Sequence, residues 1–167
     1  MRQADLEQPE LIMLVGIPGS GKSTWIRNHM NKHPEKNYVV ISSDDIIEEL
    51  GAAEGLSYTE AFSKYVGQAT SMMKSKAIEA FRNRRNIIWD QTNLTPKTRK
   101  GKIQQAQGYR RIAVVWNLTD AEWSRRFNKR KTEIGKDIPK HVLDNMQKDF
   151  TMPSKSEGFE QIIVIRN

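Results

Sequence analysis

One short segment near the N-terminus limits the fold of this chain more than any other: Gly16-Ile17-Pro18-Gly19-Ser20-Gly21-Lys22-Ser23. It matches G-x-x-x-x-G-K-[ST], a pattern that binds phosphates where it joins a β-strand to an α-helix. Both neighbours fit, because residues 11–15 are all apolar, as in a buried strand, and residues 24–31 contain neither Gly nor Pro and favour a helix. The segment therefore predicts a strand, a phosphate-binding loop and a helix in succession.

The residue types of this loop suit a nucleoside triphosphate. Glycine lacks a Cβ atom, so the backbone at Gly16, Gly19 and Gly21 can adopt unusual dihedral angles and approach a phosphate closely. Successive N–H groups at the start of a helix attract an anion. We expect Lys22 to contact the β- and γ-phosphates and the Ser23 hydroxyl to bind Mg²⁺. The residues expected around the phosphates belong to the loop and the first helical turn: Gly16, Pro18, Gly19, Ser20, Gly21, Lys22, Ser23 and Thr24.

Composition and charge restrict the possible partners and compartments. The 167 residues carry 27 basic and 20 acidic side chains, and the net charge of +7 suggests a polyanionic partner such as a nucleic acid. The absence of Cys excludes disulfides, thiol catalysis and cysteine-bound zinc. Residues 1–10 do not resemble a signal peptide, and no apolar run is long enough to span a membrane. We expect a soluble, cytoplasmic protein with an N-terminal tail (1–10) and a single domain (11–167).

Apolar runs alternate with helical patterns along the chain, which is typical of βαβ units and a parallel sheet. Strands are predicted at residues 11–15, 38–41, 86–89, 111–116 and 161–165. Helices are predicted at residues 24–31, 58–82, 95–107, 119–132 and 139–150, with a short helix after residue 45 that ends near residue 50 and a loop over 51–55. We therefore expect an α/β fold of the P-loop NTPase type, with about five parallel strands, flanking helices and a basic helical lid.

Local signals mark the ends and the buried faces of these helices. Ser57 and Thr95 are expected to cap helices, with Pro96 in the first helical position of the second one. Thr119 and Glu122 match a capping box at the start of the helix over 119–132. Apolar residues recur at helical spacing within residues 58–82, and we expect the methionines among them to fill core space.

Acidic side chains follow two of the predicted strands. Ligands of open parallel sheets bind beyond the carboxyl ends of the strands, which places the phosphate-binding loop, Asp44 and Asp90 along one rim. A carboxylate at this rim could accept a proton from an attacking hydroxyl, and Asp45 could share that role with Asp44. Asp90 could serve Mg²⁺, directly or through water. The alternative for both sites is that these side chains cap the next helix or turn.

The helix predicted over 119–132 is unusually basic. Arg126 and Arg130 are four positions apart, so they share one helical face. Two arginines that close over a γ-phosphate would stabilise its charge in the transition state. The alternative is a solvated basic face. Adjacent cations repel one another without an anionic partner, which favours phosphate binding.

Further basic residues could form a path for a phosphate backbone if they share a surface with the rim. They are Arg82, Arg84, Arg85, Lys97, Arg99, Lys100, Lys102, Arg110 and Arg111.

Together, these features resemble the polynucleotide-kinase branch of P-loop phosphotransferases over residues 11–150. Residues 16–25 are similar to the P-loop of the phage 5′-kinase, and residues 90–93 to its Asp-x-Thr-Asn motif. Asp44 lies at the position of that family's general base. Arg126 and Arg130 lie at the positions of its lid pair, which binds ATP phosphates. The resemblance implies an enzyme that uses ATP and Mg²⁺ to phosphorylate a nucleic-acid hydroxyl.

A second resemblance is closer in the C-terminal half. Residues 90–93, 108–111, 135–139 and 149–153 are similar to the nucleotide-binding domain of heterogeneous nuclear ribonucleoprotein U, which is known mainly for binding RNA. This resemblance implies an alternative function, a nucleotide-gated nucleic-acid-binding module without turnover. Arg130 and Asp44 are present here, as the kinase reading requires.

One position departs from the phage 5′-kinase pattern. In that family an arginine three residues beyond the base grips the terminal phosphate of the substrate, and here the position is Ile47. Phage DNA kinases that phosphorylate 5-hydroxymethyluracil are similar small enzymes that act on a base within DNA and need no grip on an end. We therefore expect a DNA-modifying kinase that acts on the hydroxymethyl group of this base in phage DNA, in the host cytoplasm if phage-encoded. A 5′-hydroxyl kinase is the alternative, and the basic balance counts against a small-molecule kinase.

The expected roles of the site residues follow from these resemblances. Lys22, Asp44, Arg126 and Arg130 are the expected catalytic residues. Ser23 and Asp90 are the expected Mg²⁺ ligands, and the loop residues given above bind ATP together with the two arginines.

Overall fold

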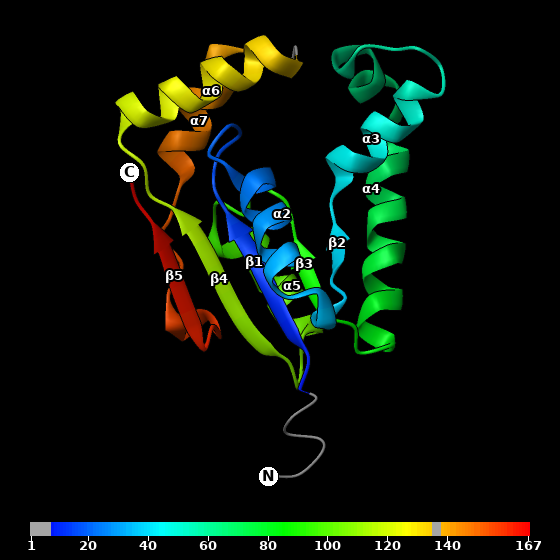
Figure 1. Cartoon of the computed structure of the whole chain (residues 1–167), viewed down its shortest axis with the longest axis vertical. Coiled ribbons are helices and arrows are strands. Elements are labelled where there is room, and N and C mark those ends of the chain that lie inside the picture. The colour runs from blue at the N-terminus through cyan, green and yellow to red at the C-terminus, as the bar shows by residue number, and fades with distance from the viewer. Residues whose placement is uncertain (1–7, 135–137) are drawn as a thin grey trace.

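A five-stranded parallel sheet forms the centre of the protein in the computed structural model, which describes residues 8–134 and 138–167 and, for residues 130–134, the backbone only. The strand order is β2-β3-β1-β4-β5 (Figure 1). The strands are β1 (Glu10–Val15), β2 (Val39–Ile41), β3 (Ile87–Trp89), β4 (Arg110–Trp116) and β5 (Gln161–Ile165). The α/β fold and the parallel sheet predicted from the sequence are therefore confirmed, with the strand before the phosphate-binding loop in the middle.

Helices cover this sheet and extend beyond the carboxyl ends of its strands (Figure 1). They are α2 (Lys22–Lys32), α3 (Ser43–Ala52), α4 (Tyr58–Arg82), α5 (Pro96–Gln105), α6 (Asp120–Ile134) and α7 (Lys140–Asp149), with short 3-10 helices η1 (Pro34–Lys36) and η2 (Lys155–Glu157). The predicted caps Ser57 and Thr95 are confirmed, because each side-chain oxygen accepts a hydrogen bond from the backbone three residues on. None of the helices within the described residues is long and apolar enough to cross a membrane.

The predicted loop over residues 51–55 is wrong at its start, because α3 continues through Gly51 and Ala52. Gly51 serves close packing of two helices. A Cβ atom at this position would lie 2.5 Å from the Cβ atom of Ala61 in α4. The glycine therefore lets α3 approach α4 and does not end the helix.

The two faces of the sheet belong to two different hydrophobic clusters. Leu11, Met13 and Val15 of β1 pack on the side of α4 and α5. Ile12 and Leu14 pack on the other side, where α2 lies in front of the sheet in Figure 1. Burial on both faces explains why this strand is an unbroken apolar run, as is usual in parallel sheets.

The helical face of α4 is less completely buried than its pattern predicted. Met73 is 4% exposed and lies in the core, as expected. Met72 and Phe62 are 44% and 45% exposed, so the prediction that the methionines of this helix fill core space is wrong for Met72.

Candidate active site

Two of the three loop glycines have the unusual backbone angles that the sequence predicted. Gly19 and Gly21 have φ angles of +82° and +112°, in the left-handed region that glycine adopts without strain. The Ser20 hydroxyl donates to the carbonyl oxygen of Ile17 at 2.7 Å and stabilises the turn. The ammonium group of Lys22 donates to the carbonyl oxygen of Gly16 at 2.8 Å. The loop is therefore a closed turn, and the Lys22 side chain lies against its backbone.

Helix α6 packs directly against this loop. Trp123 Nε1 donates to the carbonyl oxygen of Pro18 at 2.9 Å, and Arg126 Nη1 donates to that of Ser20 at 2.7 Å. A Cβ atom at Gly19 would lie 2.9 Å from the Cα atom of Phe127, so only glycine fits there. The Arg126 guanidinium thus lies beside the phosphate-binding loop.

The cations of α6 have an anionic partner within the helix. The Glu122 carboxylate accepts hydrogen bonds from Arg125 and Arg126, each with a contact of 2.7 Å. These two bonds lower the pKa of Glu122 to about 2. Because Glu122 binds the arginines, only half of the predicted capping box forms, a 3.2 Å bond from its backbone N–H to the Thr119 hydroxyl. The repulsion expected among these cations is therefore partly neutralised without any ligand.

Arg130 belongs to α6, but its side chain lies outside the described residues. Its pairing with Arg126 over a phosphate stays a prediction. Residues 135–137, in one of the segments that resemble heterogeneous nuclear ribonucleoprotein U, also lie outside the described residues.

The turn after β3 connects the loop to its neighbouring strands. The backbone N–H of Gly16 donates to the carbonyl oxygen of Thr92 at 3.0 Å, and that of Asp90 to the carbonyl oxygen of Ile41 at 2.8 Å. The buried Asn93 amide donates to the carbonyl oxygen of Leu14 at 2.8 Å. Residues 90–93 therefore hold β1, β2 and the phosphate-binding loop in one arrangement.

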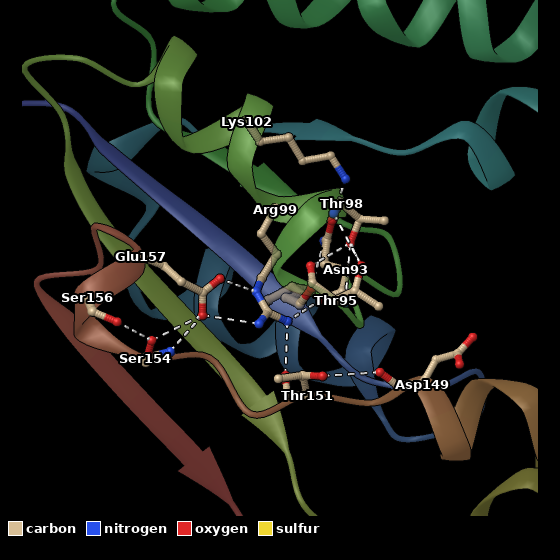
Figure 2. A network of polar contacts seen from close by, with 11 residues as sticks. Asn93, Thr95, Thr98, Arg99, Lys102, Asp149, Thr151, Ser154, Ser156 and Glu157 are labelled. Carbon is tan, nitrogen blue, oxygen red and sulfur yellow. Dashed lines mark hydrogen bonds and ion pairs between the residues drawn. The ribbon is translucent and has the colours of Figure 1, made fainter.

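A buried arginine on α5 supports this turn (Figure 2). Arg99 is 0% exposed, and it forms a two-point ion pair with Glu157 at 2.8 and 3.1 Å. Its Nη1 atom donates to the carbonyl oxygens of Asn93 and Thr151 at 2.9 and 3.1 Å. The prediction that Arg99 could follow a phosphate backbone is wrong, because its side chain is enclosed by these partners.

Lys102, one turn further along α5, also binds the turn. Its ammonium group donates to Gln91 Oε1 at 2.9 Å and to Asn93 Oδ1, and it lies 5.1 Å from the centre of the Trp89 ring. Burial lowers the pKa of Lys102 to about 8. Lys102 therefore positions the turn and is not an exposed cation for a nucleic acid.

Several basic residues lie near the amino ends of the strands, at the end of the sheet opposite the rim. Arg84 and Arg85 connect α4 to β3, and Arg110 begins β4. The Arg84 guanidinium lies 5.8 Å from the centre of the Tyr109 ring, and Arg111 forms an ion pair with Glu160. The prediction of one basic path shared with the rim is therefore wrong for these residues.

Asp44 and Asp45 both lie in the first turn of α3, but they point to different partners. The helix is capped by Ser42, whose hydroxyl accepts from the backbone N–H of Asp45 at 3.3 Å. Asp44 Oδ1 accepts from the Tyr58 hydroxyl at 2.7 Å. Asp45 lines a pocket together with Ser23 and Asp90. Sequence reasoning placed both aspartates at the rim but could not separate their orientations.

The pocket beside Ser23 has a volume of about 370 Å³. It lies between α2 on one side and β2, α3 and the end of β3 on the other. Its lining residues are Ser23, Ile26, Arg27, Met30, Asn31, Val40, Asp45 and Asp90. The oxygens of Ser23, Asp45 and Asp90 are hard ligands of the kind that Mg²⁺ prefers. Within the described part of the chain no group of three or more His, Cys, Asp or Glu side chains could hold a metal.

Similarity to known proteins extends over nearly the whole chain. Heterogeneous nuclear ribonucleoprotein U-like protein 2 of Homo sapiens is 29% identical over 161 residues, which are 94% of this chain and 21% of that protein. The bifunctional polynucleotide phosphatase/kinase of Schizosaccharomyces pombe is 28% identical over 163 residues, 93% of this chain and 33% of that protein. The chain thus spans a fifth to a third of the length of these relatives.

The fold also has a match among solved structures. A chain in the structure of the Pnkp1/Rnl/Hen1 RNA repair complex has a TM-score of 0.66 and 29% identity, over 85% of this chain and 44% of that chain. The family model described as an AAA domain matches residues 11–153, which include the phosphate-binding loop, α3, residues 90–93 and α6. This protein therefore belongs to the AAA domain family and has the fold of its P-loop kinases.

Proposed function

We propose that this protein transfers the γ-phosphoryl group of ATP to a hydroxyl group of a nucleic acid. The observation that carries the proposal is the pocket that Ser23, Asp45 and Asp90 line together. Phosphoryl transfer needs a bound triphosphate, oxygen ligands for a metal and a carboxylate that accepts a proton. Three separate elements bring these groups together next to the phosphate-binding loop.

The loop and α6 would hold the donor. Lys22 and the loop N–H groups would bind the phosphates. Arg126, which lies beside Ser20, would neutralise charge that develops on the γ-phosphoryl group. Ser23 and Asp90 are the proposed ligands of Mg²⁺, with Asp45 close by. A bound Mg²⁺ would neutralise negative charge on the β- and γ-phosphates.

The acceptor side of the reaction needs a base. The acceptor oxygen attacks the γ-phosphorus while the bond from phosphorus to the β,γ-bridging oxygen breaks, and ADP leaves with that electron pair. The hydroxyl proton passes to a carboxylate, for which we propose Asp44. The hydrogen bond from Tyr58 occupies one oxygen of Asp44 and orients the group. Asp45 is the second candidate because it lines the pocket.

The proposed acceptor is DNA, with the hydroxymethyl group of 5-hydroxymethyluracil favoured and the 5′-hydroxyl as the alternative. Two relatives support a nucleic acid in general, a polynucleotide phosphatase/kinase and a chain of an RNA repair complex. A binding module without turnover is a second candidate, which the similarity to a ribonucleoprotein U-like protein favours.

One assay separates these candidates. The protein is incubated with γ-labelled ATP, Mg²⁺ and one of three acceptors: a 5′-hydroxyl oligonucleotide, DNA with internal hydroxymethyluracil and blocked ends, or a nucleoside. Label in either DNA supports the proposed kinase and identifies its hydroxyl. Label in no acceptor, with DNA binding retained, would refute the enzyme and favour the binding module.

A further inference from the structure

One cationic side chain that lines the pocket beside Ser23, Arg27, has no role in the proposed transfer chemistry. Ser23, Arg27 and Asn31 follow one another at intervals of four along α2, so they lie on one face of the helix, and all three line the pocket. Four residues advance the helix by about 6 Å, so Arg27 lies one turn beyond Ser23 and Asn31 two turns beyond it. Arg27 is therefore about one helical turn from the proposed reaction centre.

Arg27 is available for a ligand. Its side chain is exposed, and within residues 8–134 and 138–167 its guanidinium makes no hydrogen bond or ion pair. Asp45 and Asp90 line the same pocket. Guanidinium offers five donors in a planar fork that matches the oxygens of a phosphate.

Apolar side chains form the rest of the pocket wall. Ile26, Met30 and Val40 offer a surface for the face of a sugar or a base, and the Asn31 amide can bond to a base edge. The volume of about 370 Å³ lies in the range of pockets that take small ligands. One nucleotide could lie here with its hydroxyl towards Ser23 and its phosphate towards Arg27.

Position 47, where the phage 5′-kinase pattern has a phosphate-binding arginine, cannot supply this contact. Ile47 is 1% exposed and packs with Ala61 and Ala69 of α4. Its side chain is enclosed between α3 and α4 and does not line the pocket. A phosphate contact on the acceptor would therefore come from a residue other than Ile47.

We propose that Arg27 binds a phosphate of the acceptor strand and so selects nucleotides over nucleosides. This inference rests on the proposed kinase activity and adds the chemical class that the acceptor pocket recognises. A charge-assisted hydrogen bond of this kind contributes enough affinity to change KM by about ten- to a hundredfold.

The test uses 5-hydroxymethyl-2′-deoxyuridine and its 3′-monophosphate as acceptors, because each carries both candidate hydroxyls and only one carries a phosphate. In the wild-type protein the 3′-monophosphate should have the lower KM. Arg27→Gln should raise the KM of the 3′-monophosphate about tenfold or more and leave the KM of the nucleoside, the KM of ATP and kcat nearly unchanged. Arg27→Lys should retain part of the preference, and Lys32→Gln, an exposed residue of the same helix outside the pocket, should retain all of it.

The two levels of failure are distinguishable. If the wild-type protein phosphorylates neither these probes nor DNA, the proposed function itself is overturned. If it phosphorylates them and Arg27→Gln changes both KM values equally or neither, the proposed function stands and the role of Arg27 is refuted.

Discussion

Replacing Arg99 by methionine should lower the free energy of unfolding by about 3 kcal/mol, because it leaves buried acceptors without a donor. The Arg99 side chain is completely buried, and the Glu157 side chain is 15% exposed. The Arg99 guanidinium donates two hydrogen bonds to the Glu157 carboxylate and two to the carbonyl oxygens of Asn93 and Thr151. Loss of one partner from a buried ion pair costs about 3–5 kcal/mol, and the partial exposure of Glu157 favours the lower value.

Urea unfolding followed by circular dichroism measures this loss directly. A change of about 3 kcal/mol in a chain of this length corresponds to a decrease in Tm of about 6–12 °C. Lys100→Met is the matched control, because Lys100 is the next residue of α5 and is exposed, and it should change stability by less than about 0.5 kcal/mol. A loss below about 1 kcal/mol for Arg99→Met would refute the reasoning, since the buried network would then contribute little.

The same pair gives a pH dependence with a definite sign. Burial raises the pKa of Glu157, but hydrogen bonds from Arg99 and Ser154 outweigh it and leave that pKa below its ordinary value. A carboxyl group with a lowered folded-state pKa stabilises the protein at neutral pH, and this contribution is lost as the pH falls through the lowered pKa. The stabilities of the wild type and Arg99→Met should therefore converge in acid.

Four further substitutions test the site and the turn beside it. Asp44→Asn should abolish phosphoryl transfer while ATP binding stays nearly intact, and Asp45→Asn should retain measurable transfer; the reverse order in the labelled-ATP assay would assign the base to Asp45. Gly19→Ala should abolish ATP binding in equilibrium dialysis, because a Cβ atom there meets the Phe127 backbone at 2.9 Å and the φ angle is +82°; normal binding would show that α6 moves aside at little cost. The pKa of Lys102 is lowered to about 8, so between about pH 8 and 10 the unfolded state binds more protons than the folded state. The free energy of unfolding of the wild type should therefore rise by up to about 3 kcal/mol relative to that of Lys102→Met over this range. Parallel stability curves in urea unfolding at stepped pH would contradict that pKa.

The parts of the fold that could be predicted are those with a local physical cause. Residues 11–15 are apolar without interruption because both faces of β1 are buried, and this pattern is visible in the sequence itself. Ser57 and Thr95 were recognisable as caps because each bonds to a backbone group only three residues away. The unusual backbone angles of Gly19 and Gly21 could be predicted for the same reason, because they depend on the local loop pattern.

Contacts between distant segments could not be predicted in this way. Arg99 and Glu157 are 58 positions apart, and in the sequence Arg99 lies in a basic stretch that resembles an exposed surface. The orientation of Asp44 depends on Tyr58 in the next helix. Gly51 resembles a helix end, although its role is contact with α4. Each outcome depends on which segments pack together, which no local pattern contains.

The central position of β1 has a consequence for the dynamics of the site. Strands flank it on both edges, and hydrophobic clusters cover both of its faces. Its amide hydrogens should therefore exchange with solvent only when the whole sheet opens, whereas those of helices at the rim should exchange through smaller local openings. The phosphate-binding loop thus extends from a strand that should exchange slowly, and we expect the helices around it to adjust to different acceptors.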